Sequence, residues 1–596
     1  RRRTTMKLKT YFNAALLCLA VSMFAACAGD NLADNNNEEK KQEIPQGVRF
    51  TINETKTSAK SYVGVEEDGA KTRTTIKHTP GLGADAYWNN DDYIWVKNNA
   101  GVWKKSISTM LNTERTHATF ILPGNQSDYS DGCPVIYNIS PSTSPSFHDS
   151  PEYLNINYLQ PQTKANDFSM AGYVGDCGTG VAKSTGGLGE FSFQLQHNVS
   201  YLCFLPRCSN AALGQNLQLT KIVLRSMIPN DYIAANWCNV PSTGAVFLPS
   251  TFPSWAVNGL SSPLVTASVN NFPLSNSTAE SPDLNATYIV ILPGIHDFTI
   301  TYTIKDKVTG IEAEIKKQVN GVNCKPGEIN DITANLNVTR TYTNKYYCWD
   351  ADEPYDIGHG YEASLPTIPY GKVGATYLPL SFFPVETRTS EYDPAPYDKR
   401  LGHGAWPGGN SGVTAQTDFF KNNTPNVNEA LWYAFKGDPH WDNTTPWVLH
   451  NHLYTGGMWL KTKSKICADE GITANYMENG YKADIGPYAG SYDSYQDFSD
   501  YGYDSFDNTA ASINTPLTNT TGYFFLPALG GYSNGVGIGS DTNKVWLIDV
   551  GIKGRYWTQN SSLWESGMIS FNIESGRVRV SMHDGPTAPY SVTKFQ

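Results

Sequence analysis

Residues 490–508, GSYDSYQDFSDYGYDSFDN, alternate acidic and aromatic side chains at short spacing. Rigid tyrosine rings beside carboxylates that accept hydrogen bonds suit the recognition of a sugar or a protein surface. Clustered carboxylates could also bind calcium, but the spacing of the known calcium loops is missing. A solvated, turn-rich insertion would give the same composition. Among functional interpretations we expect a ligand-binding loop here, with these candidate residues: Tyr492, Asp493, Tyr495, Asp497, Tyr501, Tyr503 and Asp504.

Three histidines lie close together in the segment HWDNTTPWVLHNH: His440, His450 and His452. If His450 and His452 lie on one strand, their side chains face the same way and could share a metal ion. The polar face of a hairpin explains the pattern without a metal. The chain also contains no Cys-x-x-Cys pair that would indicate a structural zinc site. We therefore assign no metal ligand and expect no cofactor.

Ser411 stands in the segment PGGNSGV, whose Gly-Asn-Ser-Gly resembles the nucleophile loop of a serine protease. A catalytic serine needs a base and an orienting acid that the fold brings to it. His359 and His403 precede Ser411, but nothing around them indicates a catalytic strand. A glycine-rich turn is the simpler interpretation, and we expect the protein not to be an enzyme.

Cys27 follows an apolar run and directly precedes a polar stretch. The run, residues 11–24, is shorter than the roughly 20 residues that a membrane-spanning helix needs. Lys7 and Lys9 come before it, which completes the layout of a secretory signal. Because a cysteine stands at the cleavage point, residues 1–27 resemble a bacterial lipoprotein signal peptide. The resemblance implies attachment of palmitate and other lipid at Cys27 and a location at the cell outer membrane.

Residues 28–46 contain few apolar side chains and many Asn, Asp and Glu residues. Such a segment cannot bury enough surface to offset its chain entropy, so we expect a disordered tether. Its early acidic residues, Asp30 and Asp34, resemble the surface-export signal of lipoproteins from Bacteroidetes-type bacteria. A tether after a lipid anchor would hold a surface-exposed domain away from the membrane.

The composition of the 596-residue chain favours short strands joined by many turns, with 17% charged and 12% aromatic residues. The net charge is −11 and there is no basic block, so nucleic acid is not an expected partner. Ten cysteines are present; Cys18 would leave with the signal and Cys27 is the lipid site. The spacing of the remaining eight names no pairs, and we expect at most two or three disulfides.

Alternating apolar residues predict strands at VRFTI (48–52), ATFILPG (118–124) and FSFQLQHNVSYLCFLP (191–206). His197 lies on the apolar face of the last segment, where we expect a hydrogen-bonded core histidine. The Trp-turn-strand pattern AYWNNDDYIWV and the closing segment CKPGEINDITANLNV resemble fimbrillin-type domains. The resemblance implies two tandem transthyretin-like β-sandwich domains, at 47–188 and 189–338.

The segment VNEALWYAFKG (427–437) predicts a helix that Asn428 can cap and Gly437 can end. Tryptophan-rich hairpins follow, then FLPALG and YWTQNSS. This order resembles a C-type-lectin-like domain, including the Fibrobacter-type paralogous domains, and implies an α+β fold over 345–596. The familiar sugar- and calcium-binding signature is absent, so the fold resemblance does not carry sugar binding with it.

Together these features resemble an accessory or tip subunit of the type V pilus (fimbrium) of Bacteroidetes-type bacteria. In that family a surface protease cuts after an arginine and removes the first strand, and a strand from a neighbouring pilin subunit fills the groove. Here the strand would lie near residues 48–53, and Arg73 is the candidate cut site. The lectin-like domain would then serve cell adhesion by binding a host or microbial glycan or protein.

Two other functions stay open. The first is a monomeric outer-membrane lipoprotein that binds glycans for uptake and keeps both its lipid and its first strand. The second, more distant, is an enzyme of the formylglycine-generating type. That activity needs reactive cysteines in the lectin-like domain, and Cys348 and Cys467 are far apart in sequence.

Overall fold

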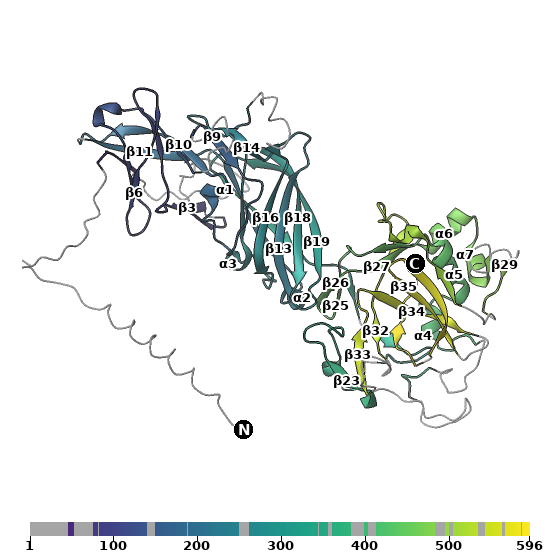
Figure 1. Ribbon diagram of the computed structural model, residues 1–596. Coiled ribbons are helices and arrows are strands. Elements are labelled where there is room, and N and C mark those ends of the chain that lie inside the picture. Colours follow the sequence, from purple (N-terminus) through teal and green to yellow (C-terminus); the bar gives the residue numbers. More distant parts are fainter. Residues whose placement is uncertain are drawn as a thin grey trace, which may run out of the picture. The chain divides into compact units, whose positions relative to one another are not determined.

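The computed structural model folds the chain mainly into β-strands that form several sheets, with the longest helices in the C-terminal third (Figure 1). The described residues are 46–52, 75–81, 83–139, 150–187, 189–249, 261–343, 345–355, 360, 362–382, 398–402, 413–482, 495–499, 505–533, 543–562, 567–585 and 587–596. Within these ranges no helix combines the length and the apolar character needed to cross a membrane. The expected mainly β class is confirmed, whereas the domain boundaries stay a prediction.

The first sheet has eight strands in the order β5-β4-β8-β10-β11-β1-β7-β6. Their bounds are β1 (Val48–Ile52), β4 (Trp95–Lys97), β5 (Trp103–Lys105), β6 (Ser108–Leu111), β7 (Ala118–Leu122), β8 (Pro134–Asn138), β10 (Cys177–Ser184) and β11 (Glu190–His197). The strands predicted at 48–52 and 118–124 are therefore present as β1 and β7. Trp88, from the predicted Trp-turn-strand pattern, is buried in the core of this sheet with its ring 5.0 Å from that of Phe120.

A separate hairpin, β2 (Thr75–Thr79) and β3 (Gly83–Tyr87), forms its own two-stranded sheet. Its strands are antiparallel, with Thr75 opposite Tyr87 and Thr79 opposite Gly83. The turn between them includes Gly81, whose backbone has φ 76°, a conformation that glycine adopts without strain. This hairpin begins two residues after the candidate cut site, Arg73.

Two sheets share the next core. One has the order β17-β12-β20 and the other β16-β13-β18-β19. The bounds are β12 (Ser200–Arg207), β13 (Leu217–Ser226), β16 (Leu264–Pro273), β17 (Thr287–Ile291), β18 (Gly294–Asp306), β19 (Glu312–Cys324) and β20 (Ile329–Asn335). Phe204 on β12 and Tyr302 on β18 meet in this core with ring centroids 6.4 Å apart. A smaller sheet joins β9 (Tyr153–Ile156), β14 (Ala234–Asn239) and β15 (Ser261–Ser262).

The single strand expected over 191–206 is wrong. The segment divides into β11, which belongs to the first sheet, and β12, which belongs to the next. The division falls at Asn198, whose side-chain amide donates to Thr179 Oγ1 at 3.1 Å and to the Gly244 carbonyl at 2.5 Å. β11 alternates buried and exposed residues, whereas β12 is buried along nearly its whole length because both of its faces are covered. The first sheet thus continues past the expected boundary at residue 188.

The C-terminal region contains a six-stranded sheet in the order β22-β37-β34-β35-β36-β30. Its strands are β22 (Tyr346–Tyr347), β30 (Phe506–Asn508), β34 (Lys553–Ser561), β35 (Met568–Glu574), β36 (Arg577–Asp584) and β37 (Tyr590–Ser591). Smaller sheets are formed by β24 (His440–Asp442), β27 (Gly457–Lys461) and β31 (Tyr523–Pro527); by β23 (Tyr377–Pro379), β32 (Gly531–Tyr532) and β33 (Lys544–Ile548); and by β28 (Tyr481–Lys482) and β29 (Tyr495–Gln496).

The helices of this region are α4 (Asp418–Asn423), α5 (Val427–Lys436), α6 (Lys463–Glu470) and α7 (Ala474–Asn479). The predicted helix is present as α5 and has Gly437 at its C-cap, but the expected cap at Asn428 is wrong. Asn426 caps the helix instead, because its side chain accepts from the Glu429 amide while the Glu429 carboxylate accepts from the Asn426 amide. This reciprocal pair is a capping box.

A fourth small sheet, β21 (Thr341–Tyr342), β25 (Trp447–Leu449) and β26 (His452–Tyr454), joins the C-terminal region to the two sheets that share the core around β12 and β18, here called the second sandwich. Asp306, at the end of β18, accepts from the Leu453 amide at 3.0 Å and lies 3.1 Å from His452 Nδ1. Thr309 Oγ1 also donates to the Leu453 carbonyl at 3.0 Å. Val448 and Leu453 extend the core of the second sandwich, so this junction is both apolar and hydrogen-bonded.

Eight cysteines lie in the described ranges, and none of these eight is in a disulfide: Cys133, Cys177, Cys203, Cys208, Cys238, Cys324, Cys348 and Cys467. Seven are buried and Cys467 is half-buried. They act as small core residues, so the two or three disulfides allowed by the sequence are not formed among them.

Candidate functional site

β1 lies inside the first sheet, between β11 and β7. It pairs in parallel with β11, with Phe50 opposite Phe191, and antiparallel with β7, with Phe50 opposite Phe120. Every other strand of this sheet comes later in the chain than Arg73. A single chain cut after Arg73 would therefore sever β1 from all the strands that it pairs with.

The side chains of β1 alternate between the core and the surface. Val48, Phe50 and Ile52 are buried, at 2%, 0% and 0% exposure, while Arg49 is exposed. The Phe50 ring stacks on Phe191 with centroids 4.9 Å apart. Burying a side chain of this size contributes roughly 1.5–3 kcal/mol, so the three together hold β1 by several kcal/mol in addition to its ladder hydrogen bonds.

Loss of β1 would expose both backbone groups and apolar side-chain positions of the sheet. The facing backbone groups of β7 and β11 would lose their partners, and three adjacent apolar positions would open to water. An extended segment with apolar side chains at alternate positions could pair with these backbone groups and fill these positions, as in strand addition.

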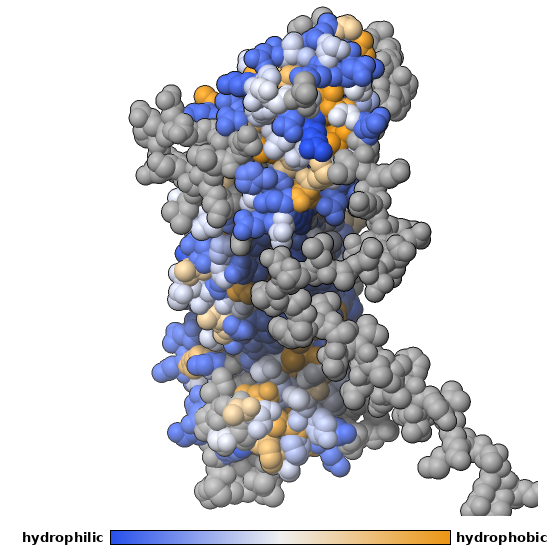
Figure 2. All heavy atoms as spheres, turned by 90° about the vertical axis from the view of Figure 1, so that its left-hand side faces the viewer, coloured by the Kyte–Doolittle hydropathy of each residue, from blue (hydrophilic) through white to orange (hydrophobic). Residues whose placement is uncertain are grey.

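Figure 2 shows the face of the molecule that lies at the left in Figure 1. This face is largely hydrophilic and carries small, separate hydrophobic patches.

Two of the predicted site residues, Cys27 and Arg73, lie outside the described residues. The same holds for Ser411, His359 and His403 of the excluded protease hypothesis. Of the candidate binding loop, Tyr492, Asp493, Tyr501, Tyr503 and Asp504 also fall outside the described ranges, whereas Tyr495 and Asp497 fall within them.

Tyr495 and Asp497 fix their own segment to the neighbouring helices. The Tyr495 hydroxyl donates to the Tyr476 carbonyl at 2.6 Å, and the two rings contact at a tilt of 33° with centroids 4.1 Å apart. Asp497 accepts from Asn428 Nδ2 at 2.9 Å. Burial alone would raise the pKa of Asp497, but the hydrogen bonds from Asn428 and Ser499 lower it below its ordinary value. These two residues thus hold residues 495–499 against α5 and α7, and the role of the segment in binding stays a prediction.

The predicted core histidine is confirmed, because His197 is 5% exposed and its Nδ1 lies 2.9 Å from Asp176. The arrangement considered for His450 and His452 is wrong, since the two do not share a strand. β25 ends at Leu449, and His450 and Asn451 form the turn to β26 with φ of 51° and 63°. Burial and the nearby His452 lower the pKa of His450 to about 4.

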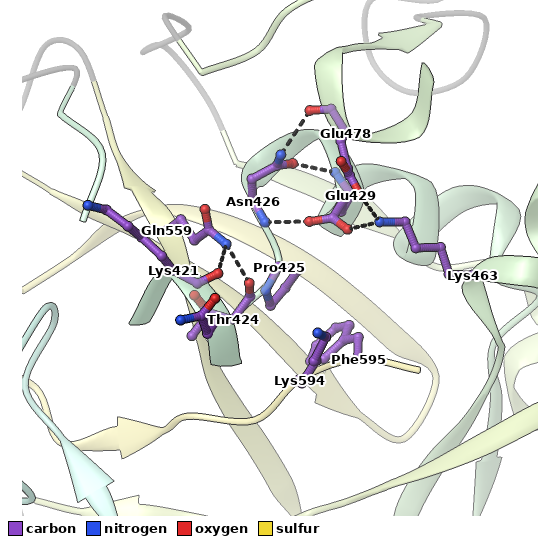
Figure 3. Close-up of a pocket in the computed structure, with 11 residues that line it drawn as sticks. Lys421, Thr424, Pro425, Asn426, Glu429, Lys463, Glu478, Gln559, Lys594 and Phe595 are labelled. Atoms are coloured by element: carbon purple, nitrogen blue, oxygen red, sulfur yellow. Dashed lines mark hydrogen bonds and ion pairs between the residues drawn. The ribbon is translucent and has the colours of Figure 1, made fainter. Parts of the chain in front are cut away.

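A pocket of about 310 Å³ lies where the N-terminus of α5 meets α6, α7 and the chain end (Figure 3). Gln559 closes one side by donating to the Lys421 and Thr424 carbonyls, at 2.9 Å and 2.7 Å. Across the pocket in Figure 3, Glu429 and Glu478 both reach Lys463. The wall is mostly polar and combines carboxylates and ammonium groups, so it suits a ligand rich in hydroxyl or anionic groups.

The charges of this pocket are coupled through Lys463, whose Nζ lies 2.6 Å from Glu429 Oε1 and also bonds to Glu478. Burial alone would lower the pKa of Lys463, but the hydrogen bonds and charges of the two glutamates raise it above its ordinary value. Lys421 and Lys594 add two further ammonium groups to the wall. No sequence motif indicates this pocket, because its lining residues come from several elements spread over residues 421–595.

An exposed aromatic cluster forms a second candidate contact surface in this region. Tyr370 and Tyr377 are 50% and 44% exposed, and each ring centroid lies 5.0 Å from that of Trp546 on β33. Lys544 Nζ lies 4.4 Å from the Tyr377 centroid. Exposed rings with a polar rim are typical of surfaces that contact sugars or proteins. Tyr370 and Tyr377 stand outside every motif considered from the sequence.

No protein-family model matches the chain, and no curated protein matches it. Solved structures similar to it include candidate cell adhesion proteins from Bacteroides fragilis and Bacteroides ovatus. The first is 9% identical over 50% of this chain and 94% of that chain, with a TM-score of 0.28. The second is 13% identical over 48% and 92%, with a TM-score of 0.26. A fimbrial protein from Bacteroides ovatus is 10% identical over 88% and 98%, with a TM-score of 0.21.

Proposed function

We propose that this protein is a surface adhesion or fimbrial subunit of the accessory or tip type that assembles by strand addition. It would reach the outer membrane as a lipoprotein anchored through Cys27 and would be cut after Arg73. β1 would then leave, and a strand from a neighbouring subunit would occupy its place. The region after residue 345 would serve as a lectin-like adhesive domain, and the protein would have no enzymatic activity.

The observation that carries this proposal is the position of β1. It is an interior strand, paired on both sides, and yet among the described strands of its sheet it alone precedes Arg73. Its buried residues Val48, Phe50 and Ile52 define three apolar positions that a donor strand would have to match. A donor with polar residues at those positions would leave them unfilled and would bind much more weakly.

The test is to lock β1 in place. Thr51 on β1 and Thr119 on β7 are register partners whose hydroxyl oxygens lie 3.0 Å apart. Replacing both, as Thr51→Cys with Thr119→Cys, brings two thiols to a distance and geometry that suit a disulfide. We expect the oxidised double variant to reach the cell surface but to form no filaments, and reduction to restore them. The single variants Thr51→Cys and Thr119→Cys are the matched controls and should assemble normally.

If the oxidised double variant forms filaments as well as the parent does, the proposal of strand exchange at β1 is wrong. N-terminal sequencing of the assembled protein adds a second readout, with a start at residue 74 as the expected result. Immunogold labelling with an antibody to the region after residue 345 then locates the protein. Label at filament ends supports the tip position, and label along the shaft argues against it.

The second candidate function is a monomeric outer-membrane lipoprotein that binds glycans for uptake. The observation that favours it is the polar pocket beside α5, which needs no filament to bind a hydroxyl-rich ligand. In that case the mature protein would keep both lipidated Cys27 and β1. Lipid at residue 27 in the mature surface protein, with label confined to the cell body, would support this function over the first.

A further inference from the structure

Three side chains that can bind a metal converge beneath the β2–β3 hairpin: His78, Cys203 and Asp331. They come from β2, β12 and β20, which are far apart in the sequence. One ligand atom of each, the imidazole nitrogen, the thiol sulfur and a carboxylate oxygen, lies within 4.8 Å of the other two. Cys203 and Asp331 are direct register partners in the parallel β12–β20 pair, so their side chains leave the same face of the sheet.

The three ligands are held firmly. The side chain of His78 is 0% exposed and that of Asp331 is 16% exposed, while Cys203 is fully buried. His78 Nε2 lies 2.7 Å from Asp331 Oδ1, and the Gly81 amide donates to Asp331 Oδ2 at 2.9 Å. Asp331 is thus the member that reaches solvent, and it lies where an ion could enter.

The donor set points to one kind of ion. Thiolate sulfur, imidazole nitrogen and carboxylate oxygen are the usual ligands of Zn²⁺, and a site with three protein ligands keeps its fourth position for a water molecule. Calcium and magnesium prefer oxygen ligands, so a buried thiol argues against both. Binding of Zn²⁺ would release the Cys203 thiol proton to solvent, and His78 would bind through Nε2 as a neutral imidazole with its proton on Nδ1.

The chain offers an internal comparison, because it contains other His–Asp pairs with similar distances. Among the described residues, a third ligand completes the pair only at His78 and Asp331. The other pairs are His197–Asp176 at 2.9 Å, His296–Asp231 at 2.7 Å, His452–Asp306 at 3.1 Å and His440–Asp438 at 3.4 Å. A His–Asp hydrogen bond alone is therefore a recurrent structural device in this chain, and Cys203 is what distinguishes this one.

We propose that His78, Cys203 and Asp331 bind one Zn²⁺ ion, which clamps the β2–β3 hairpin to the β12–β20 pair of the second sandwich. The hairpin is the part of the chain that directly follows residue 74. The clamp would hold this segment in place whether or not the chain is cut after Arg73. The inference therefore stands independently of strand exchange.

The test uses the full chain, purified with reduced thiols and stripped of metal by a chelator. Titration with Zn²⁺ in a calorimeter should give one ion per chain and a higher unfolding temperature. Substitution with Co²⁺ should give a thiolate-to-cobalt charge-transfer band in the near ultraviolet. Cys203→Ala should remove the band and weaken binding at least about tenfold, a loss of about 1.4 kcal/mol. His78→Gln should weaken binding comparably.

Two variants serve as matched controls. Cys238→Ala removes another fully buried thiol, and His296→Gln breaks a His–Asp pair of the same 2.7 Å distance. Both should keep the cobalt band and the affinity of the parent. If Cys203→Ala does not fold, Cys203→Ser keeps the side-chain volume and should still lose the band. A parent protein without a thiolate–cobalt band, or a band that survives in both Cys203 variants, would overturn the site.

Discussion

β1 of the first sheet and β12 of the second sandwich occupy equivalent positions. Each is an interior strand with one parallel neighbour, β11 or β20, and one antiparallel neighbour, β7 or β17. Each carries a fully buried phenylalanine, Phe50 or Phe204. The two strands differ in how the chain connects them to their neighbours. Two residues separate β12 from β11, whereas the whole segment 53–74 separates β1 from the next strand.

This difference shows that pairing alone does not decide whether a strand can be exchanged. One cut after residue 73 would free β1 from the chain that holds its sheet. β12 is continuous at one end with β11 and at the other with the helix that precedes β13, so two cuts would be needed. If the proposed cut occurs, β1 would therefore be replaceable in its sheet, whereas β12 would stay in place.

The largest effect should come from the two phenylalanines. Phe50→Ala and Phe204→Ala each delete a fully buried ring, and each should destabilise its own domain by about 3–5 kcal/mol. Scanning calorimetry of the full chain should show one transition shifted by the first variant and a different transition shifted by the second.

A protease site engineered at residue 73 would make β1 removable and leave β12 in place, so that the two strands can be compared directly. After cleavage and removal of the peptide that carries β1, the transition of the first sheet should fall by more than Phe50→Ala lowers it in the uncut chain, because the whole strand is lost. The transition that Phe204→Ala shifts should keep its value. If removal of the peptide leaves the transition of the first sheet unchanged, β1 does not hold its sheet in the way proposed.

Sequence patterns predicted the strands well where one face is buried and the other is wet. The alternation of Val48, Phe50 and Ile52 was enough to define β1 with its true bounds. The same rule failed at residues 191–206, since β12 is covered on both faces and its sequence continues the alternation of β11 by chance. The boundary depends on Asn198, and its partners Thr179 and Gly244 are known only once the chain is folded.

The candidate sites were harder to predict because their members are distant in sequence. The predicted cap of α5, Asn428, lies two residues after the true one, since Asn426 and Asn428 are both good capping residues and only the reciprocal bond with Glu429 distinguishes them. The His78–Cys203–Asp331 cluster has no local motif at all. It arises from the parallel pairing of β12 with β20, which brings together residues that no spacing rule connects.

An intermediate effect should come from Asp306, which couples the second sandwich, but not the first, to the C-terminal region. Burial alone would raise its pKa, but the hydrogen bonds from His452, Thr309, Leu453 and Val308 lower it. The stability that these bonds supply is therefore present above the ordinary aspartate pKa and is lost as the pH falls through the lowered value. Asp306→Asn should cost about 1–3 kcal/mol at neutral pH.

The pH dependence of Asp306→Asn separates the junction of the second sandwich from the first sheet. In the parent, acid should separate the calorimetric transitions of the second sandwich and the C-terminal region. In Asp306→Asn this acid-dependent change should be absent, because the titrating group has been removed. The transition of the first sheet should respond to neither change, and a shift there of comparable size would contradict the assignment of Asp306 to one junction.

The smallest effect should come from the cap of α5, which lies in neither the sheet of β1 nor the sheet of β12. Asn426→Ala removes the side chain that accepts from the Glu429 amide and should destabilise the C-terminal region by about 1 kcal/mol. Asn428→Ala is the matched control, since Asn428 instead donates to Asp497 and accepts from the Phe498 amide. It should expose residues 495–499 to limited proteolysis without lowering helix stability by the capping amount. The transitions of the first sheet and of the second sandwich should stay unchanged in both variants. An equal loss of helix stability in the two variants would mean that Asn428 contributes to the cap as much as Asn426 does. That result would not affect the comparison of β1 with β12.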